Sequence, residues 1–438
     1  DKASRINAYV KGDSTKLKPF VRNGVTYQLV NVFPTGEPIY YRTFNRGSGF
    51  TIHANRLYSG GDLGLEGIDG AGLVAGVWDE GLVLQTHTEF LKDDGATKVT
   101  RGDNNFSTSV HSTHVGGTIA AKGAVEQARG IAYNADLISY DWNNDLNEMR
   151  TFASKGYLVS NHSYGTSAED IATAGKIWYF GAYVDETALL DNLAYAYPYY
   201  QPVIAIGNDR DEAHLYHPTK NGYDLTTHFS NGKNALAVGA VQELLSYTSP
   251  QDVKITLFSN TGPTDDGRIK PNLVAKGYGV YSTSKYSANS YATNNGTSMA
   301  SPAIAGSVLL LQQLYSKEKG SYMKSATVRG LLQHTTMEAG SADGPDYMYG
   351  WGLANLEDAA KAIINEGKTD ALNTSLIKEN MLSNTTNEYT EEVVALGTDP
   401  LIVSISWTER AGLVNSGTLD WAQASLLNDL DVRVFAAD

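Results

Sequence analysis

The chain has 438 residues, of which 42% are hydrophobic and 10% aromatic, so it is long enough for about two or three domains with sizeable cores. Its net charge of −14 disfavours nucleic acid and anionic membrane surfaces as partners. The absence of cysteine excludes disulfides and thiolate metal sites, and no stretch approaches the ~18–20 apolar residues of a membrane span. With 43 glycines and 27 tyrosines, the composition suits a soluble, loop-rich enzyme better than a helical bundle.

Residues 1–58 are predicted to form a β-rich N-terminal extension. Asn23-Gly24 is a strong hairpin turn between alternating segments, and a second turn is expected at 34–36. The first 46 residues carry eight Lys and Arg against three acids, so this segment is basic while the remainder is acidic. Two interpretations stay open: the segment lies against the acidic body, or it is a solvated pair of strands.

Residues 59–366 alternate between short apolar strands and helices, as expected of a catalytic α/β domain. Strands are predicted at 73–78, 137–140, 158–163, 203–206 and 235–241. Helices are predicted at 110–120, 146–154, 185–197, 323–335 and 356–364. Buried strands separated by helices indicate a doubly wound, mostly parallel sheet covered on both faces. Functional residues of such sheets lie at the carboxyl ends of the strands, and Asp79, Ser163 and Asn208 are expected there.

Residues 367–438 are predicted to be a polar linker followed by the start of a C-terminal β-sandwich. The segments 401–407 and 430–435 alternate like antiparallel strands. Fewer than 50 residues follow residue 390, which is few for an independent sandwich, so we expect this domain to be incomplete.

Ser298 lies where an apolar helical run begins, directly after the turn-forming Asn294-Asn295-Gly296. The unpaired N–H groups and the dipole of a helix N-terminus stabilise negative charge there. A serine that becomes a nucleophile and then holds a tetrahedral oxyanion benefits from this position. The alternative interpretation is that Ser298 only caps the helix.

Two further segments contain residues that could activate Ser298 as a nucleophile. Asp79 ends a strand and His111 begins a helix, so they supply an orienting group and a general base for Ser298. Asp79 lies in Val-Trp-Asp-Glu-Gly, His111 begins His-Ser-Thr-His-Val-Gly-Gly-Thr, and Ser298 lies in Gly-Thr-Ser-Met-Ala-Ser-Pro. In these motifs and in their order, the chain resembles the subtilisin-like serine proteases (subtilases) over about residues 65–365. One departure is Ser112, which stands where the family usually has glycine.

The resemblance implies a role for each matched residue. His111 would take the proton of Ser298 and pass it to the leaving amine, while Asp79 would fix the tautomer of His111. Asn208 resembles the oxyanion asparagine of the family and would act together with the Ser298 backbone N–H. The implied activity is that of a secreted or cell-surface endopeptidase that works through an acyl-enzyme.

The resemblance also implies where an extended substrate would bind. One wall would be an extended segment that pairs with the substrate, the other would border the primary specificity pocket, and a tryptophan would begin a second edge strand. These residues are Ser163, Tyr164, Gly165, Ala205, Ile206, Gly207 and Trp142. Pairing along an extended chain implies a polypeptide substrate. The family usually carries a cleavable pro-segment, which is an expected partner before maturation, so residues 1–58 are either a mature extension or a remnant of processing.

Five acids follow the expected substrate walls and allow two interpretations. They are Glu169, Asp170, Asp209, Asp211 and Glu212. They would favour a basic substrate side chain in the primary pocket, or they are solvated loop acids, which is the interpretation we favour.

No cofactor is expected for the chemistry, whereas structural Ca²⁺ is common in the family. Asp429 and Asp431 lie in a Leu-Asn-Asp-Leu-Asp motif that resembles the β-sandwich of alkaline and kexin-like subtilases, and they are either Ca²⁺ ligands or part of a solvent-facing turn. His111 and His114 lack the spacing and the glutamate of a zinc-binding helix, so His114 is interpreted as structural.

Two other functions compete with the peptidase hypothesis. An α/β-hydrolase esterase predicts Gly-x-Ser-x-Gly and the order Ser, Asp, His, but here the fifth position is Ala300 and the order differs. A non-catalytic binding or adhesion protein on a subtilase scaffold predicts damage to the triad or to Asn208, and all four positions are intact.

Overall fold

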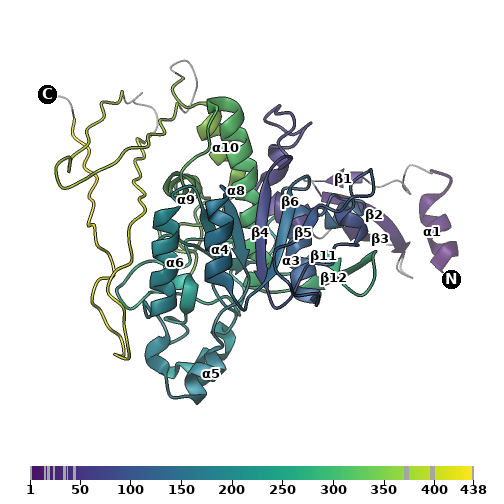
Figure 1. The fold of residues 1–438 in the computed structure, drawn as a ribbon. Coiled ribbons are helices and arrows are strands. Elements are labelled where there is room, and N and C mark those ends of the chain that lie inside the picture. The colour runs from purple at the N-terminus through teal and green to yellow at the C-terminus, as the bar shows by residue number, and fades with distance from the viewer. Residues whose placement is uncertain are drawn as a thin grey trace.

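A seven-stranded sheet, parallel throughout, forms the centre of the computed structural model (Figure 1). The structure describes residues 2–13, 16, 20–22, 25–32, 36, 38–42, 46–368, 374–394 and 400–436. The strands of this sheet are β4 (Val74–Asp79), β5 (Val99–Arg101), β6 (Asp136–Asp141), β7 (Val159–His162), β8 (Gln201–Ala205), β9 (Leu236–Val241) and β10 (Leu273–Lys276). The predicted α/β class with a mostly parallel sheet is confirmed.

The order of the strands reverses beside β4. The sheet runs β10-β9-β8-β7-β4-β6-β5, so the chain leaves β4 in one direction to build β5 and β6 and in the other to build β7 to β10. Ligands of open parallel sheets bind where the strand order reverses, outside the carboxyl ends of the strands. Asp79 is the last residue of β4 and lies at this point.

Helices cover both faces of the sheet because successive side chains of a strand point to opposite sides. Ala75 and Val77 pack in the larger core with α3 (Val110–Ala120), α8 (Thr297–Lys319), α9 (Ser325–His334) and α10 (Leu356–Ile364). Trp78 packs on the other face with α4 (Asp145–Ser154) and α6 (Asp185–Ala196). Two shorter helices, α5 (Ala168–Thr173) and α7 (Ala213–Tyr216), form a small cluster of their own.

A separate three-stranded antiparallel sheet forms near the N-terminus, as the sequence predicts. It consists of β1 (Phe20–Arg22), β2 (Val25–Val32) and β3 (Pro38–Arg42), and Arg22 pairs with Val25 around the expected hairpin turn. The turn residues Asn23 and Gly24, and Pro34 and Thr35 of the second turn, lie outside the described residues.

Two helices in this N-terminal region were not predicted. They are α1 (Lys2–Val10), at the right edge of Figure 1, and α2 (Arg46–Thr51). Val10 of α1 packs against Val32 of β2, and Ile6, one turn earlier, lies on the same face of the helix.

The predicted elements of the catalytic domain lie close to their expected positions, and the structure adds β5, β10, the hairpin of β11 (Val280–Ser284) and β12 (Ser290–Asn294), and the short helices α5 and α7. β5 was not predicted because it is only three residues long. The hairpin of β11 and β12 was missed because Ser, Thr and Tyr replace the apolar residues that mark a strand. This hairpin delivers the chain to the start of α8. None of the described helices combines the length and apolar character that a membrane span requires.

The C-terminal β-sandwich stays a prediction, and the two strands expected at its start are not formed in the described residues. The described residues from 400 to 436 form neither helix nor strand, so 401–407 and 430–435 are not the predicted strands. An extended segment becomes a strand only when its N–H and C=O groups pair with a neighbour, and alternation by itself supplies no neighbour. Instead, this part of the chain runs past α6 and α9 on the surface of the catalytic domain (Figure 1).

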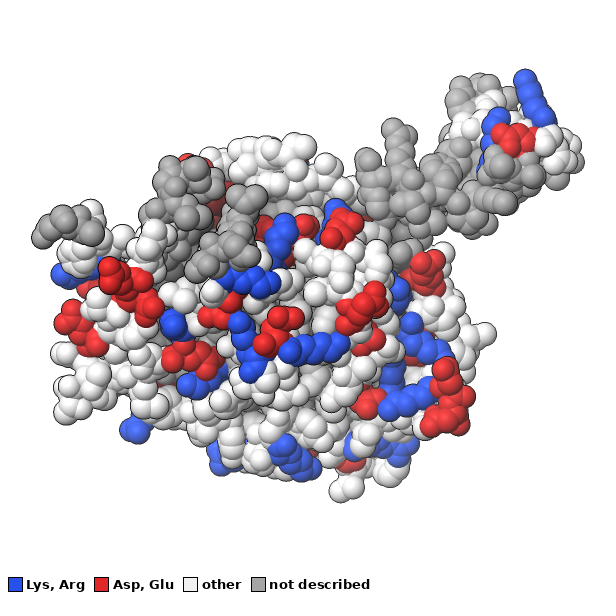
Figure 2. Space-filling model, turned by 90° about the horizontal axis from the view of Figure 1, so that it is seen from above, with Lys and Arg blue, Asp and Glu red and all other residues white. Residues whose placement is uncertain are grey.

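Charged side chains of both signs are interspersed on the face shown in Figure 2. That face has no broad basic area of the kind that binds a phosphate backbone, which agrees with the net charge of −14.

Candidate active site

Asp79 and His111 are in direct contact at the carboxyl end of β4. The Nδ1 atom of His111 lies 2.8 Å and 2.9 Å from the two carboxylate oxygens of Asp79, so Nδ1–H donates and Nε2 is left as the basic nitrogen. Asp79 is fully buried and also accepts the Glu80 N–H at 2.7 Å. A fully buried carboxylate therefore fixes both the ring and its tautomer.

The local sequence explains why His111 occupies this position. Ser109 is the N-cap of α3 and accepts the Ser112 N–H at 3.0 Å, and its hydroxyl donates to Glu80 at 2.6 Å. The Ser112 hydroxyl is buried and donates to the Gly81 carbonyl at 2.5 Å. The departure at Ser112 therefore leaves the helix regular and ties its first turn to the loop after β4.

Opposing effects act on the pKa of His111. Burial lowers it, but the hydrogen bond and the negative charge of Asp79, aided by the charge of Glu80, outweigh burial and raise the pKa above the ordinary value. The imidazolium form is therefore stabilised, as a group that receives a proton during catalysis requires.

Ser298 is the second residue of α8, a helix that is buried over most of its length. Gly296, and not Ser298, occupies the N-cap position, so the interpretation of Ser298 as a mere cap is wrong. Pro302 has no N–H, and the Ser298 carbonyl therefore lacks the donor that an α-helix supplies four residues later. The Ser163 hydroxyl takes that place and donates to the Ser298 carbonyl at 3.1 Å.

The hydroxyl of Ser298 points to the backbone of Ser163, the residue that follows β7. It donates to the Ser163 carbonyl at 3.3 Å, and within the described part of the chain it forms no hydrogen bond with His111. The helices that carry His111 and Ser298, α3 and α8, pack against each other on one face of the sheet. For a proton to pass between the two side chains, the Ser298 hydroxyl would have to turn from the Ser163 carbonyl toward Nε2 of His111. Catalytic hydrogen bonds often form only once the substrate is bound.

Asn208 is held so that its amide N–H₂ group faces outward. Its Oδ1 accepts the Thr297 N–H at 2.8 Å and the Thr297 hydroxyl at 3.0 Å. These two bonds occupy the oxygen end of the side chain and leave Nδ2 as a donor beside the start of α8.

Gly296 leaves space between Nδ2 of Asn208 and the Ser298 backbone N–H. Its φ is +153°, and a Cβ at this position would lie 3.5 Å from the Ser298 nitrogen and 3.7 Å from Nδ2. A side chain here would strain the backbone and fill the space that these two donors border. The arrangement is suited to binding an oxyanion.

The expected substrate residues gather near this point. Ser163 is buried, Tyr164 is half-buried and Gly165 is exposed directly after β7. On the opposite side, Ala205 and Ile206 are buried at the end of β8, and Gly207 is half-buried beside Thr297.

The expected edge strand at Trp142-Asn143-Asn144 is absent. These residues form the turn between β6 and α4, because Asp141 accepts the Asn143 N–H at 2.8 Å and Asn144 caps the helix. The indole of Trp142 is 43% exposed, and its centroid lies 5.6 Å from that of the Tyr164 ring. Trp142 thus presents an exposed indole beside Tyr164 and is not part of a strand.

Four of the five acids beyond the substrate walls are exposed, as solvated loop acids are. They are Glu169, Asp170, Asp211 and Glu212. Asp209 differs because it is half-buried and accepts the Asn260 amide at 2.8 Å. Burial raises the pKa of Asp209 above its ordinary value, although hydrogen bonds from Asn260 and the backbone oppose the shift.

Within the described part of the chain, none of the other residues considered as metal ligands belongs to a cluster of three or more possible ligands. His114 is fully buried and its Nε2 contacts the carbonyls of Val280 and Ala292, while burial lowers its pKa to about 4. Asp429 and Asp431 are exposed, and Asp431 lies 3.5 Å from Arg433.

Sequence reasoning missed the residues that support the site. Thr297 orients Asn208, Asn161 donates to the Ser163 hydroxyl at 2.9 Å, and the Ser301 hydroxyl donates to Asn161 at 2.7 Å. Thr297 and Ser301 lie in the motif around Ser298, but the sequence does not show toward which residue each hydroxyl points.

Comparisons with known proteins identify the family of this chain. The model of the subtilase family matches residues 70–352. Subtilisin DY of Bacillus licheniformis is 29% identical over 303 residues, which cover 68% of this chain and 93% of that protein. An extracellular serine protease of Serratia marcescens is 26% identical over 385 residues, which cover 74% of this chain and 34% of that protein.

A solved structure shows the same fold. The protease CspB of Clostridium perfringens superposes with a TM-score of 0.56 at 16% identity, covering 74% of this chain and 99% of that one.

An open parallel sheet with an aspartate–histidine pair at its switch point and a serine at a nearby helix N-terminus defines a serine hydrolase. The family match covers more than half of the chain, and the chain therefore belongs to the subtilase family of serine proteases.

Proposed function

We propose that the protein is an endopeptidase in which Asp79, His111 and Ser298 act as a catalytic triad through an acyl-enzyme. The observation that carries the proposal is the hydrogen bond between Nδ1 of His111 and the fully buried Asp79. It leaves Nε2 as the base for a serine that lies at the start of α8.

The mechanism conserves protons at each step. Nε2 of His111 takes the proton of the Ser298 hydroxyl while the serine oxygen bonds to the substrate carbonyl carbon. The Asn208 amide and the Ser298 N–H stabilise the resulting oxyanion. His111 then protonates the leaving amine as the C–N bond breaks. A water molecule gives a proton to the same imidazole and attacks the acyl-enzyme, and His111 returns that proton to the Ser298 oxygen as the C–O bond breaks and the acid product leaves.

An extended polypeptide is the substrate that this site suits. Ser163 to Gly165 and Ala205 to Gly207 border the site from two neighbouring strands, and an extended chain can lie between them. The Serratia marcescens relative is named an extracellular protease, which supports secretion of this protein, with attachment at the cell surface as the alternative. A pro-segment of its own is the partner that we expect before maturation.

The test is Ser298→Ala, compared with Ser316→Ala, which changes a serine on the same helix far from the site. We expect Ser298→Ala to abolish cleavage of an internally quenched peptide and covalent labelling by a fluorophosphonate, with unchanged circular dichroism. Ser316→Ala should retain both. A folded wild-type protein that takes up no label would instead favour the non-catalytic binding protein.

A further inference from the structure

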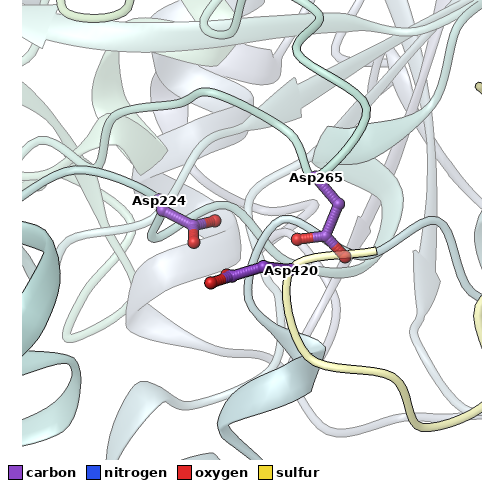
Figure 3. Close-up of side chains that lie close together, drawn as sticks. All are labelled: Asp224, Asp265 and Asp420. Carbon is purple, nitrogen blue, oxygen red and sulfur yellow. The ribbon is translucent and has the colours of Figure 1, made fainter. Parts of the chain in front are cut away.

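Three carboxylates from distant segments meet on one side of the catalytic domain (Figure 3). Asp224 precedes the 3₁₀ turn at His228–Asn231, Asp265 follows β9 by more than twenty residues, and Asp420 belongs to the C-terminal segment. One oxygen of each lies within 4.8 Å of the others. Figure 3 shows the carboxylates of Asp224 and Asp265 turned toward each other, with Asp420 beside them.

Two of the oxygens are buried and have no hydrogen-bond partner. Asp224 is only 5% exposed, and its Oδ1 is unpartnered, as is the buried Oδ1 of Asp265. A buried carboxylate oxygen without a partner is costly unless a ligand satisfies it.

Both unpartnered oxygens lie close to the backbone of residue 181, which is glycine. Gly181 has a φ of +70°, and a Cβ there would collide with Oδ1 of Asp224 and lie 2.9 Å from Oδ1 of Asp265. The two oxygens therefore lie close to the same glycine, at a position that has no room for a side chain.

The polar neighbours neutralise only part of the charge. Lys220 pairs with Oδ2 of Asp224 at 3.2 Å and with Oδ1 of Asp420 at 2.6 Å. The Asn415 amide donates to Oδ2 of Asp265 at 3.1 Å. These contacts leave the two buried Oδ1 oxygens free, and among the described residues Lys220 is the one ammonium group that forms ion pairs with this cluster of three carboxylates.

We propose that Asp224, Asp265 and Asp420 bind one Ca²⁺ ion that ties the C-terminal segment to the catalytic domain. The side-chain ligands are hard oxygens held by loops, without imidazole or thiolate, which suits Ca²⁺ better than a transition metal. Asp420 is half exposed, so water has access to complete the six to eight ligands that Ca²⁺ typically takes. Mg²⁺ fits less well because it demands near-ideal octahedral geometry.

The ion would also steady the loop that carries Asn208. Leu225, next to Asp224, accepts the Asn260 amide at 3.0 Å. Asn260 in turn accepts the Asp209 N–H at 2.7 Å, one residue beyond Asn208. The binding site and the oxyanion donor are therefore linked through one side chain.

The experiment measures binding of the metal itself to the full chain. Ser298→Ala serves as the parent to prevent self-digestion, and after chelation and buffer exchange it is titrated calorimetrically with CaCl₂ and, separately, MgCl₂. Asp265→Asn and Asp420→Asn are compared with Asp429→Asn, which alters the exposed acid that the sequence offered as a ligand. We expect both cluster variants to lose one Ca²⁺ per chain or to bind it more than about tenfold more weakly. Asp429→Asn should match the parent, and Mg²⁺ should bind at least about tenfold more weakly.

A second readout is protection of residues 411–427 from an added protease. Ca²⁺ should slow cleavage there in the parent and not in Asp420→Asn. Because Asp420 is half exposed, its substitution is not expected to unfold the chain, so a loss of protection would report on Ca²⁺ binding. Unchanged Ca²⁺ binding in Asp420→Asn, or a loss found only in Asp429→Asn, would overturn the proposal. Binding is measured in a background without the proposed nucleophile, so this result is independent of whether Ser298 is catalytic.

Discussion

A buried carboxylate beside a partly exposed imidazole determines how this site responds to pH. The charge of Asp79 raises the pKa of His111 against the effect of burial. His111 must be neutral to accept a proton, so activity is lost as the pH falls through this raised pKa. The acidic limb of the wild-type pH profile should therefore lie above the ordinary value of about 6.5.

We predict that Asp79→Asn lowers kcat by about 10⁴-fold, because the amide no longer holds His111 in the reactive tautomer. The acidic limb of kcat/KM should also move to lower pH, since the charge that raises the pKa of His111 is gone. Profiles of kcat/KM against pH for both proteins test this. An unshifted acidic limb in the variant would mean that Asp79 does not control the protonation of His111.

Asn208 should act mainly in the transition state, because its amide faces the position of the developing oxyanion. We predict that Asn208→Ala lowers kcat by about 10²–10³-fold with little change in KM. Thr297→Val should have a much smaller effect, about fivefold, since the Thr297 backbone N–H still holds Oδ1 of Asn208. Steady-state kinetics on one peptide substrate distinguish these outcomes, and an increase confined to KM would contradict the oxyanion role.

At the scale of elements, the start of α8 depends on a strand that is more than a hundred residues away in sequence. Pro302 removes a helical donor, and the Ser163 hydroxyl at the end of β7 replaces it. The replacement joins the helix that carries Ser298 to the strand that borders the substrate site.

We predict that Ser163→Ala lowers the free energy of unfolding by about 1–3 kcal/mol, because the buried Ser298 carbonyl loses its donor. In a Pro302→Ala background the loss should be smaller, since the introduced alanine restores a backbone N–H for that carbonyl. Urea denaturation of the four proteins of this double-mutant cycle, each carrying Ser298→Ala, gives the coupling energy. Additive effects would show that the two residues do not share this carbonyl.

At the scale of the whole molecule, a segment without secondary structure is attached to the catalytic domain by buried polar contacts. Lys233 donates to Glu409 at 2.6 Å, and both side chains are almost fully buried. Arg329 of α9 donates to the Trp407 carbonyl at 2.9 Å. These contacts hold residues 407–410 on the domain.

We predict that Glu409→Gln lowers the free energy of unfolding by about 3 kcal/mol, because it leaves Lys233 buried without a counter-charge. Hydrogen exchange of residues 407–428 should accelerate in parallel. The control is Asp431→Asn, which breaks an exposed ion pair and should change stability by less than about 1 kcal/mol. Equal protection in wild type and Glu409→Gln would show that this pair does not hold the segment.

The same contact implies a pH dependence. Burial raises the pKa of Glu409, but Lys233 and the backbone N–H groups of Leu427 and Asn428 outweigh burial and lower the pKa below its ordinary value. A lowered pKa in the folded state contributes stability above the unfolded value of about 4.3. That contribution is lost as the pH falls through the folded pKa, so the segment should stay attached at neutral pH.

Much of the fold could be predicted because its signals are local. Apolar runs such as 235–241 predict buried strands from the local sequence alone, and the run of small residues at 110–120 predicts a helix in the same way. The same kind of local signal predicted strands at 401–407 and 430–435 that the structure does not contain, since alternation gives a strand only if a partner strand is present.

By itself, the sequence determined the class of the fold, the three motifs and the residues that carry the proposed chemistry, because residue type and spacing express these features directly. Tertiary structure alone decided that Thr297 turns Asn208 outward, that Ser163 replaces the missing donor of Pro302, and that Asp224, Asp265 and Asp420 meet. Each of these is a contact between residues distant in the chain, and its geometry depends on how buried elements pack against one another. Periodicity does not encode that packing, so only the folded chain reveals it.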